Sequence, residues 1–178
     1  IGMGIGIVPM RLAREGVVVD VAEINPAIVP LAEKWFDFDE GLLRQLYRQD
    51  GRLIMNRLKK SQTKYDTIIL DAFLGESSPS HLMTTEAFHS MVDCLADNGT
   101  LIINSFGRDL DEGAVMDDTK RVFNQKRDFL TVSLFNTLKT VFKDVRIHGA
   151  GGGNVFFVAC NHTLPEEPPV FDFSNSHV

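Results

Sequence analysis

The chain has 178 residues, of which 44% are hydrophobic and 24% charged, and this composition is typical of one globular domain. No stretch approaches the roughly 18 apolar residues of a membrane-spanning helix, and no basic region precedes an apolar one at the N-terminus. The formal net charge of −6 argues against a nucleic-acid backbone as partner. Cys94 and Cys160 lie far apart in apolar stretches. We therefore expect reduced core cysteines, no metal site and a cytoplasmic protein without a membrane segment.

A glycine-rich stretch, GMGIG at 2–6, opens the chain. Such loops let the backbone approach a ligand closely, and they normally follow a buried strand. Only Ile1 precedes the loop, so we expect a truncated first strand. The valine-rich run GVVVDVAEI at 16–24 predicts a buried strand that ends at Glu23, and NPAIVPLAEKWF at 25–36 predicts an amphipathic helix.

Strands and helices alternate through the middle of the chain. The patterns predict an edge strand over 42–49, a short basic helix over 51–60, a β-branched strand over 65–73, a helix over 84–96, a turn at 98–99 and a buried strand over 100–106. The charged residues 108–127 predict a loop with a helical piece.

The C-terminal part predicts an amphipathic helix over 129–142 and two closing strands, VRIHG at 145–149 and NVFFVAC at 154–160. The segment between these strands is too short for a helical crossover, so they should form an antiparallel hairpin. The fold class is therefore α/β with a mostly parallel, Rossmann-like sheet. We expect one domain over 1–160 and a tail over 161–178.

Glycines and acids fall at the predicted carboxyl ends of strands, where open α/β sheets bind ligands. They are Gly2, Gly4, Gly6, Glu23, Asp50 and Asp71. An acid about 20 positions after the loop can accept both hydroxyls of a ribose, and Asp50 could accept from an adenine amino group. The glycine loop does not separate a dinucleotide from S-adenosylmethionine. The closing hairpin argues against a nicotinamide-dependent oxidoreductase, because a dinucleotide domain does not need it.

At these positions the chain resembles the spermidine synthase family and its methyltransferase-like relatives. The resemblance rests on GMGIG, VDVAEINP, QDGR, YDTIILDAF, SPSHLMTTEAF, NGTLIINSF and GGNVFFVA, spread over residues 1–160. It implies the class I methyltransferase fold and a transferase that uses S-adenosylmethionine or its decarboxylated form, without a metal. It also implies a small-molecule acceptor, such as a polyamine, and a homodimer.

Carried over residue by residue, the resemblance makes Asp71 the catalytic group that orients and deprotonates an attacking amine. It assigns cofactor contacts to Gly2, Gly4, Gly6, Glu23, Ile24, Asp50, Gly51, Asp71 and Ala72. It assigns the acceptor side to Phe73, Glu76 and His81.

Three departures from the family pattern stand out. Leu74 replaces the second aspartate of the loop after Asp71, and the glycine loop lacks the acid that the synthases often carry there. We also expect no counterpart of their N-terminal β-hairpin domain. A decarboxylated cofactor presents only an ammonium and favours such an acid. The departures weaken aminopropyl transfer relative to methyl transfer. They also support an alternative, a non-catalytic module that keeps the adenosyl-nucleotide pocket.

Overall fold

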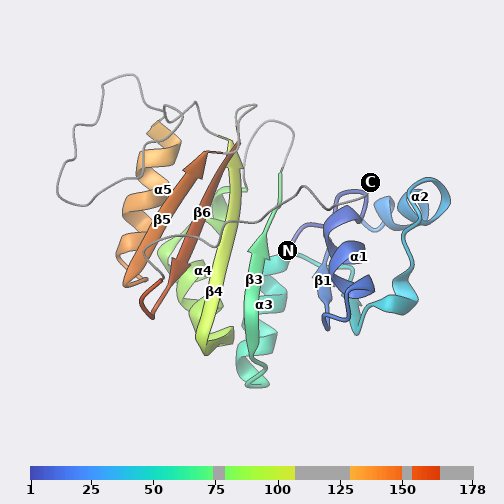
Figure 1. Cartoon of the computed structure of the whole chain (residues 1–178), viewed down its shortest axis with the longest axis horizontal. Helices are drawn as coiled ribbons and strands as arrows, with labels where there is room; N and C mark the ends of the chain where they lie inside the picture. Colours follow the sequence, from blue (N-terminus) through green and yellow to red (C-terminus); the bar gives the residue numbers. More distant parts are fainter. Residues whose placement is uncertain (74–78, 107–128, 150–153, 165–178) are drawn as a thin grey trace.

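The computed structural model describes residues 1–73, 79–106, 129–149 and 154–164 (Figure 1). Its elements, in chain order, are α1 (Ile7–Arg14), β1 (Asp20–Ala22), α2 (Ile28–Trp35), the 3-10 turn η1 (Glu40–Leu42), β2 (Gln45–Tyr47), α3 (Gly51–Lys60), β3 (Tyr65–Leu70), the 3-10 turn η2 (Ser80–Leu82), α4 (Thr85–Cys94), β4 (Leu95–Phe106), α5 (Phe129–Lys139), β5 (Asp144–Gly149) and β6 (Asn154–Cys160).

Four strands form one sheet in the order β3-β4-β6-β5. β3 and β4 run parallel, whereas β6 is antiparallel to both of its neighbours, β4 and β5. The predicted closing hairpin is thus confirmed, with its second strand inserted beside β4. Phe157 of β6 lies opposite both Ile103 of β4 and Ile147 of β5, and all three side chains are buried. This apolar register holds the hairpin against the parallel part of the sheet.

β1 and β2 form a separate parallel pair, and the backbone of Ile1 and Gly2 joins this pair to β3. The Gly2 amide donates to the Ala22 carbonyl (2.8 Å), and the Asp71 amide donates to the Ile1 carbonyl (2.9 Å). The Ile1 amino group donates to the Ile69 carbonyl (2.7 Å). Figure 1 shows the N-terminus between β1 and β3. Ile1 and Gly2 therefore bridge the β1–β2 pair and the four-stranded sheet through backbone hydrogen bonds.

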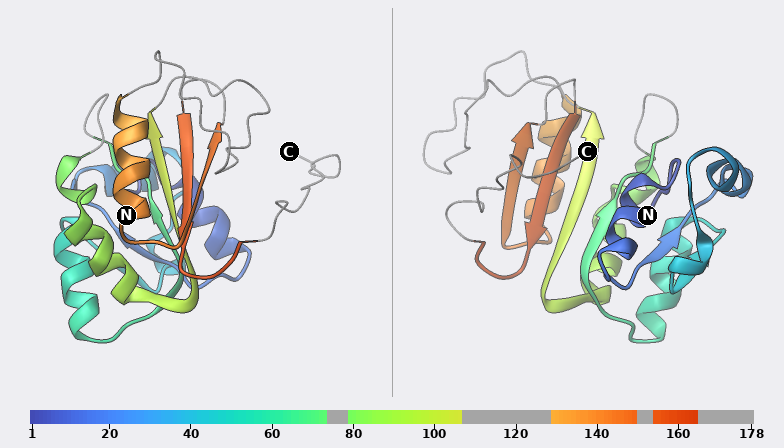
Figure 2. Two further views of the ribbon diagram at one scale, coloured as in Figure 1. Left: turned by 90° about the vertical axis from the view of Figure 1, so that its left-hand side faces the viewer. Right: turned by 45° about the vertical axis from the view of Figure 1, so that its right-hand side comes forward.

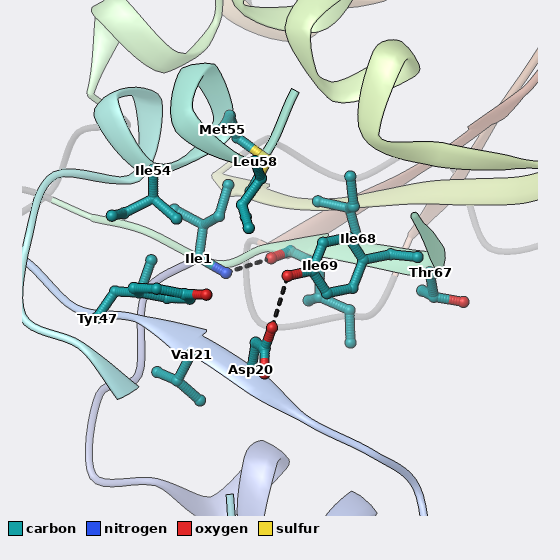
Figure 3. Close-up of a pocket in the computed structure, with 12 residues that line it drawn as sticks. Ile1, Asp20, Val21, Tyr47, Ile54, Met55, Leu58, Thr67, Ile68 and Ile69 are labelled. Atoms are coloured by element: carbon teal, nitrogen blue, oxygen red, sulfur yellow. Dashed lines mark hydrogen bonds between the residues drawn. The ribbon is translucent and has the colours of Figure 1, made fainter. Parts of the chain in front are cut away.

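A narrow cavity of about 60 Å³ lies between β1 and β3, next to Ile1 (Figure 3). Apolar side chains of α3, including Ile54 and Leu58, line one side of it. Asp20 of β1 and Tyr65 of β3 also line it, and the Tyr65 hydroxyl donates to the Asp20 carboxylate (2.6 Å).

Helices α3, α4 and α5 stand side by side along one face of the sheet (Figure 2). Their apolar faces meet the strands in a core whose fully buried members include Ile54, Leu70, Phe88, Leu101, Leu138 and Phe157. α1 and α2 lie at the β1–β2 end and pack around a smaller cluster that includes Met10, Val21, Val29 and Leu46.

Three local predictions need correction. The strand predicted over 16–24 shortens to β1, because Val17 and Val18 lie on the surface. The apolar face predicted for the helix over 25–36 comprised Ile28, Leu31, Ala32 and Trp35. Helix α2 buries Ala32 as predicted, together with Val29, but Leu31 and Trp35 are exposed. The turn predicted at 98–99 lies inside β4, as an irregularity between two stretches paired with β3. The predicted loop 108–127 falls outside the described residues.

Within the described ranges, no helix is long and apolar enough to cross a membrane.

The tight contact of Gly2 gives a test of this geometry. Gly2 has φ +84°, and an added Cβ would overlap the carbonyl oxygen of Asp71. Gly16 has a similar φ of +86° but open space around the Cβ position, so it is a matched control. We expect Gly16→Ala to lower the free energy of unfolding by about 1 kcal/mol, from backbone strain alone, and Gly2→Ala by about 3 kcal/mol or more. Urea unfolding measures both, and equal losses would contradict the packing of Gly2 on Asp71.

Candidate functional site

The glycine loop turns sharply at three left-handed residues, Gly2, Gly4 and Gly6, whose φ angles are +84°, +54° and +88°. Two of them are needed for packing, since an added Cβ would overlap Asp71 at Gly2 and the Phe38 ring at Gly6. Gly4 is exposed, and no atom of the described residues lies within 4 Å of its Cβ position. Gly2 and Gly6 therefore fix the path of the loop, and Gly4 presents open backbone to solvent.

Glu23 fastens this loop to the end of β1. Its side chain is buried, and the residue is 8% exposed. One carboxylate oxygen accepts from the Met3 amide (2.9 Å) and the other from the Asn25 amide (2.8 Å). Each oxygen keeps capacity for a second hydrogen bond, so the carboxylate is held in place and can still accept from a ligand hydroxyl.

Asp71 directly follows β3 and lies beside the loop. Its Oδ1 accepts from the side-chain amide of Asn104 on β4 (2.9 Å), and the Asn104 Oδ1 is buried with no hydrogen-bond partner among the residues that the structure describes. The rings of Phe73 and Phe106 lie 4.6 Å apart, centroid to centroid, and are tilted by 47°. The ends of β3 and β4 thus combine a positioned carboxylate with an aromatic pair.

Asp50 caps helix α3, and its carboxylate has two partners. Oδ1 accepts from the Leu53 amide (3.1 Å), and Oδ2 lies 2.8 Å from Nε2 of His81. Burial tends to raise the pKa of Asp50, but hydrogen bonds from His81 and from backbone amides outweigh it, so the pKa lies below its usual value. Asp50 is therefore an anion and a pure acceptor at neutral pH.

Most of the predicted site residues come together around the glycine loop, at the carboxyl ends of β1 and β3. Gly2 contacts the backbone of Asp71 and Ala72, and Gly51 packs so closely on Ile1 that a Cβ would overlap its side chain. Ile24 follows Glu23 and is 58% exposed. The structure places His81 against Asp50, while Glu76 lies outside the described residues.

Asn104 and Phe106 are the neighbours of Asp71 and Phe73 that the sequence analysis did not single out. The available signal was their position at the carboxyl end of the buried strand TLIINSF, the same signal that identified Asp71. In the part of the chain that is described, no group of three or more His, Cys, Asp and Glu side chains could hold a metal ion.

The start of α1 is the other chemical feature of the site. The helix follows Gly6, has no side-chain cap and carries no acid in its first turn. Free amides at the start of a helix favour an anionic ligand group. The site thus offers carboxylates at Glu23, Asp50 and Asp71 for hydroxyl, amino or cationic groups, and an uncapped helix start for an anion.

No protein-family model matches the chain, but individual proteins do. It is 37% identical over 108 residues to the polyamine aminopropyltransferase of Vibrio vulnificus, covering 60% of this chain and 36% of that protein. It is 31% identical over 109 residues to an N-terminal histidine N-methyltransferase of Emericella nidulans, covering 60% of this chain and 19% of that protein. The chain therefore spans about a third or less of the length of these relatives.

Solved structures share the fold. Human methyltransferase-like protein 13 in complex with SAH superposes with a TM-score of 0.71 at 20% identity, over 98% of this chain and 84% of that chain. A spermidine synthase in complex with the transition-state analogue AdoDATO gives 0.61 at 17% identity, over 90% and 51%. The predicted Rossmann-like methyltransferase fold is thus confirmed, as is the resemblance to both the spermidine synthases and the methyltransferases.

The double anchorage of Glu23 can be tested by substitution. Glu23→Gln leaves one oxygen and places an amide donor against a backbone N–H, so one buried hydrogen bond is lost. We expect the free energy of unfolding to fall by about 1–3 kcal/mol. Glu33→Gln on the exposed side of α2 makes the same chemical change and should stay within about 0.5 kcal/mol of the unsubstituted chain. If urea unfolding shows no difference between the two variants, Glu23 does not anchor the loop.

Proposed function

We propose that residues 1–160 form the S-adenosylmethionine-binding domain of a transferase that methylates an amine. The observation that carries this proposal is the convergence of the Glu23-anchored glycine loop with Asp71 at the carboxyl ends of β1 and β3. Ligands bind at this position in open α/β sheets. The similarity to aminopropyl- and methyltransferases supports it.

Each part of the cofactor has a proposed partner. Glu23 accepts hydrogen bonds from the ribose hydroxyls, and the exposed Ile24 lies against the adenine ring. Asp50 and Gly51 form the far side of the adenine pocket. The methionine part runs along Gly2, Gly4 and Gly6 and past Ala72.

The start of α1 favours S-adenosylmethionine over its decarboxylated form. The loop and the first turn of α1 carry no acid, and the helix start has no side-chain cap. Pro9 has no N–H and the Met10 amide donates to the Gly6 carbonyl (3.1 Å), so the amides of Ile7 and Val8 and the positive end of the helix dipole would stabilise a methionine carboxylate. The decarboxylated cofactor lacks the anion and would gain nothing from this arrangement.

The chain's role in the transfer step falls to Asp71 and its neighbours. The bound cofactor supplies a methyl group activated by its sulfonium. Asp71 would accept a hydrogen bond from the acceptor amine and take up its proton as the nitrogen–carbon bond forms and the methyl carbon–sulfur bond breaks, which leaves the cofactor as the neutral thioether S-adenosylhomocysteine. Asn104 holds the other carboxylate oxygen in position, and Phe73 and Phe106 pack against the carbon skeleton of the acceptor.

Aminopropyl transfer to a polyamine is the second candidate. It is favoured by the 37% identity to the Vibrio vulnificus polyamine aminopropyltransferase. The same Asp71 would serve that reaction, because an amine is again the nucleophile. The two candidates differ in the cofactor that the α1 end of the site accepts.

Calorimetry separates the candidates. We expect S-adenosylmethionine and S-adenosylhomocysteine to bind the chain more tightly than decarboxylated S-adenosylmethionine and methylthioadenosine, with NAD showing no binding. Tighter binding of the decarboxylated cofactor would establish the aminopropyl reading instead. If no adenosyl ligand binds at millimolar concentration, the transferase proposal is wrong. Binding without transfer to any amine tested would leave the non-catalytic module.

The role of Asp71 has its own test. Transfer of a labelled methyl group to a panel of polyamines and short peptides should fall about 100-fold or more in Asp71→Asn, with cofactor affinity kept within a few-fold. Asp66→Asn, on an exposed position of the same strand, is the matched control and should leave the rate unchanged. An unchanged rate in Asp71→Asn would remove the catalytic assignment while leaving the fold and the binding site intact.

A further inference from the structure

Two contacts cross between the start of α3 and the turn η2. Nε2 of His81 lies 2.8 Å from Oδ2 of Asp50, and Nη1 of Arg52 donates to the main-chain carbonyl of His81 (3.0 Å). The two residues at the start of α3 therefore hold His81 by its side chain and its backbone at once. His81 belongs to the segment between β3 and α4, which the sequence analysis assigned to the acceptor.

These contacts determine the orientation of the Asp50 carboxylate. The Leu53 amide holds Oδ1, which serves as the cap of α3, and His81 holds Oδ2 (2.8 Å). If the hydrogen bond from the Leu53 amide were the only one, the carboxylate could still turn about the side-chain torsion, and Oδ2 would have no fixed direction. With both oxygens held, the remaining lone pairs point in fixed directions. The side chains of Asp50 and His81 are 32% and 44% exposed, so a ligand can reach the pair.

We propose that His81 is a positioning residue for base recognition: it sets the Asp50 carboxylate to accept from the 6-amino group of adenine and so makes the site selective for adenosyl over inosyl ligands. This inference rests on the proposed function, because it concerns the same cofactor site. Hypoxanthine carries a carbonyl oxygen where adenine carries the amino group. A carboxylate fixed at that point accepts from adenine and repels the oxygen of hypoxanthine.

Calorimetry with two probes, S-adenosylhomocysteine and S-inosylhomocysteine, tests the role of His81. We expect the unsubstituted chain to prefer the adenosyl probe. His81→Ala should weaken its binding about 5- to 10-fold, and the adenosyl-to-inosyl affinity ratio should fall by the same factor, since one hydrogen bond to the carboxylate is lost. His81→Gln keeps an N–H donor at the position of Nε2 and should restore both values to within twofold. His89→Ala, an exposed histidine of α4, is the matched control and should match the unsubstituted chain.

A double-substitution cycle tests whether His81 acts through Asp50. Asp50→Ser keeps a good helix cap, but its side chain is too short to reach either His81 or the base. In that background, His81→Ala should leave the affinity for S-adenosylhomocysteine unchanged.

The results that overturn the inference are distinct from failure of the proposed function. An unsubstituted chain that binds neither probe removes the proposed function, and this inference with it. If the chain binds S-adenosylhomocysteine but His81→Ala behaves like the unsubstituted chain, only the role of His81 falls. The role of His81 also falls if His81→Ala lowers the affinity for both probes by the same factor, or if it lowers the affinity for S-adenosylhomocysteine in the Asp50→Ser background. In either case His81 would only order the loop.

Discussion

The backbone of Ile1 and Gly2 is the constraint on which the rest of the structure depends. It pairs with β1 through Ala22 and with β3 through Ile69 and Asp71. These hydrogen bonds place the start of the glycine loop between the carboxyl ends of two strands that are not paired with each other in a sheet. Because a Cβ at Gly2 would overlap Asp71, the loop can take this path only with glycine there. The spacing between Glu23 and Asp71, and with it the width of the site, is set by two residues.

The acids of the site are held by the chain before any ligand arrives. Glu23 has two backbone amides, Asp50 has a backbone amide and His81, and Asp71 has Asn104. Three carboxylates near one loop repel one another, and partial burial adds to the cost of keeping them ionised. The hydrogen bonds offset part of that cost and fix the directions of the oxygens. A cationic ligand, such as a sulfonium or an amine, offsets more of it, so the charge of the site itself favours this class of ligand.

Whether a feature could be predicted from the sequence depends on how far apart along the chain its interacting residues lie. Helix α3 matches its prediction because its signals are local: Asp50 caps it, and its apolar spacing is regular. Glu23 and Asp71 could be identified because each ends a strongly apolar strand. Asn104 could not be paired with Asp71, since that contact depends on the register of two strands, in which Leu70 lies opposite Ile103. No sequence signal links positions 50 and 81, which meet only after the fold brings η2 against α3.

In the proposed function, the site has a half that recognises the nucleoside and a half that meets the acceptor, and the two are built differently. The nucleoside half uses backbone amides and the Glu23 carboxylate, which packing around Gly2 and Gly6 holds in place. The acceptor half uses side chains at the ends of β3 and β4, where Asp71, Asn104 and the Phe73–Phe106 pair meet. Substitutions in that second half change no backbone hydrogen bond of the first. This division fits the similarity of the chain to both an aminopropyltransferase and a methyltransferase. The contact between His81 and Asp50 joins the two proposed halves, because a residue of the segment assigned to the acceptor holds the carboxylate that we propose binds the base.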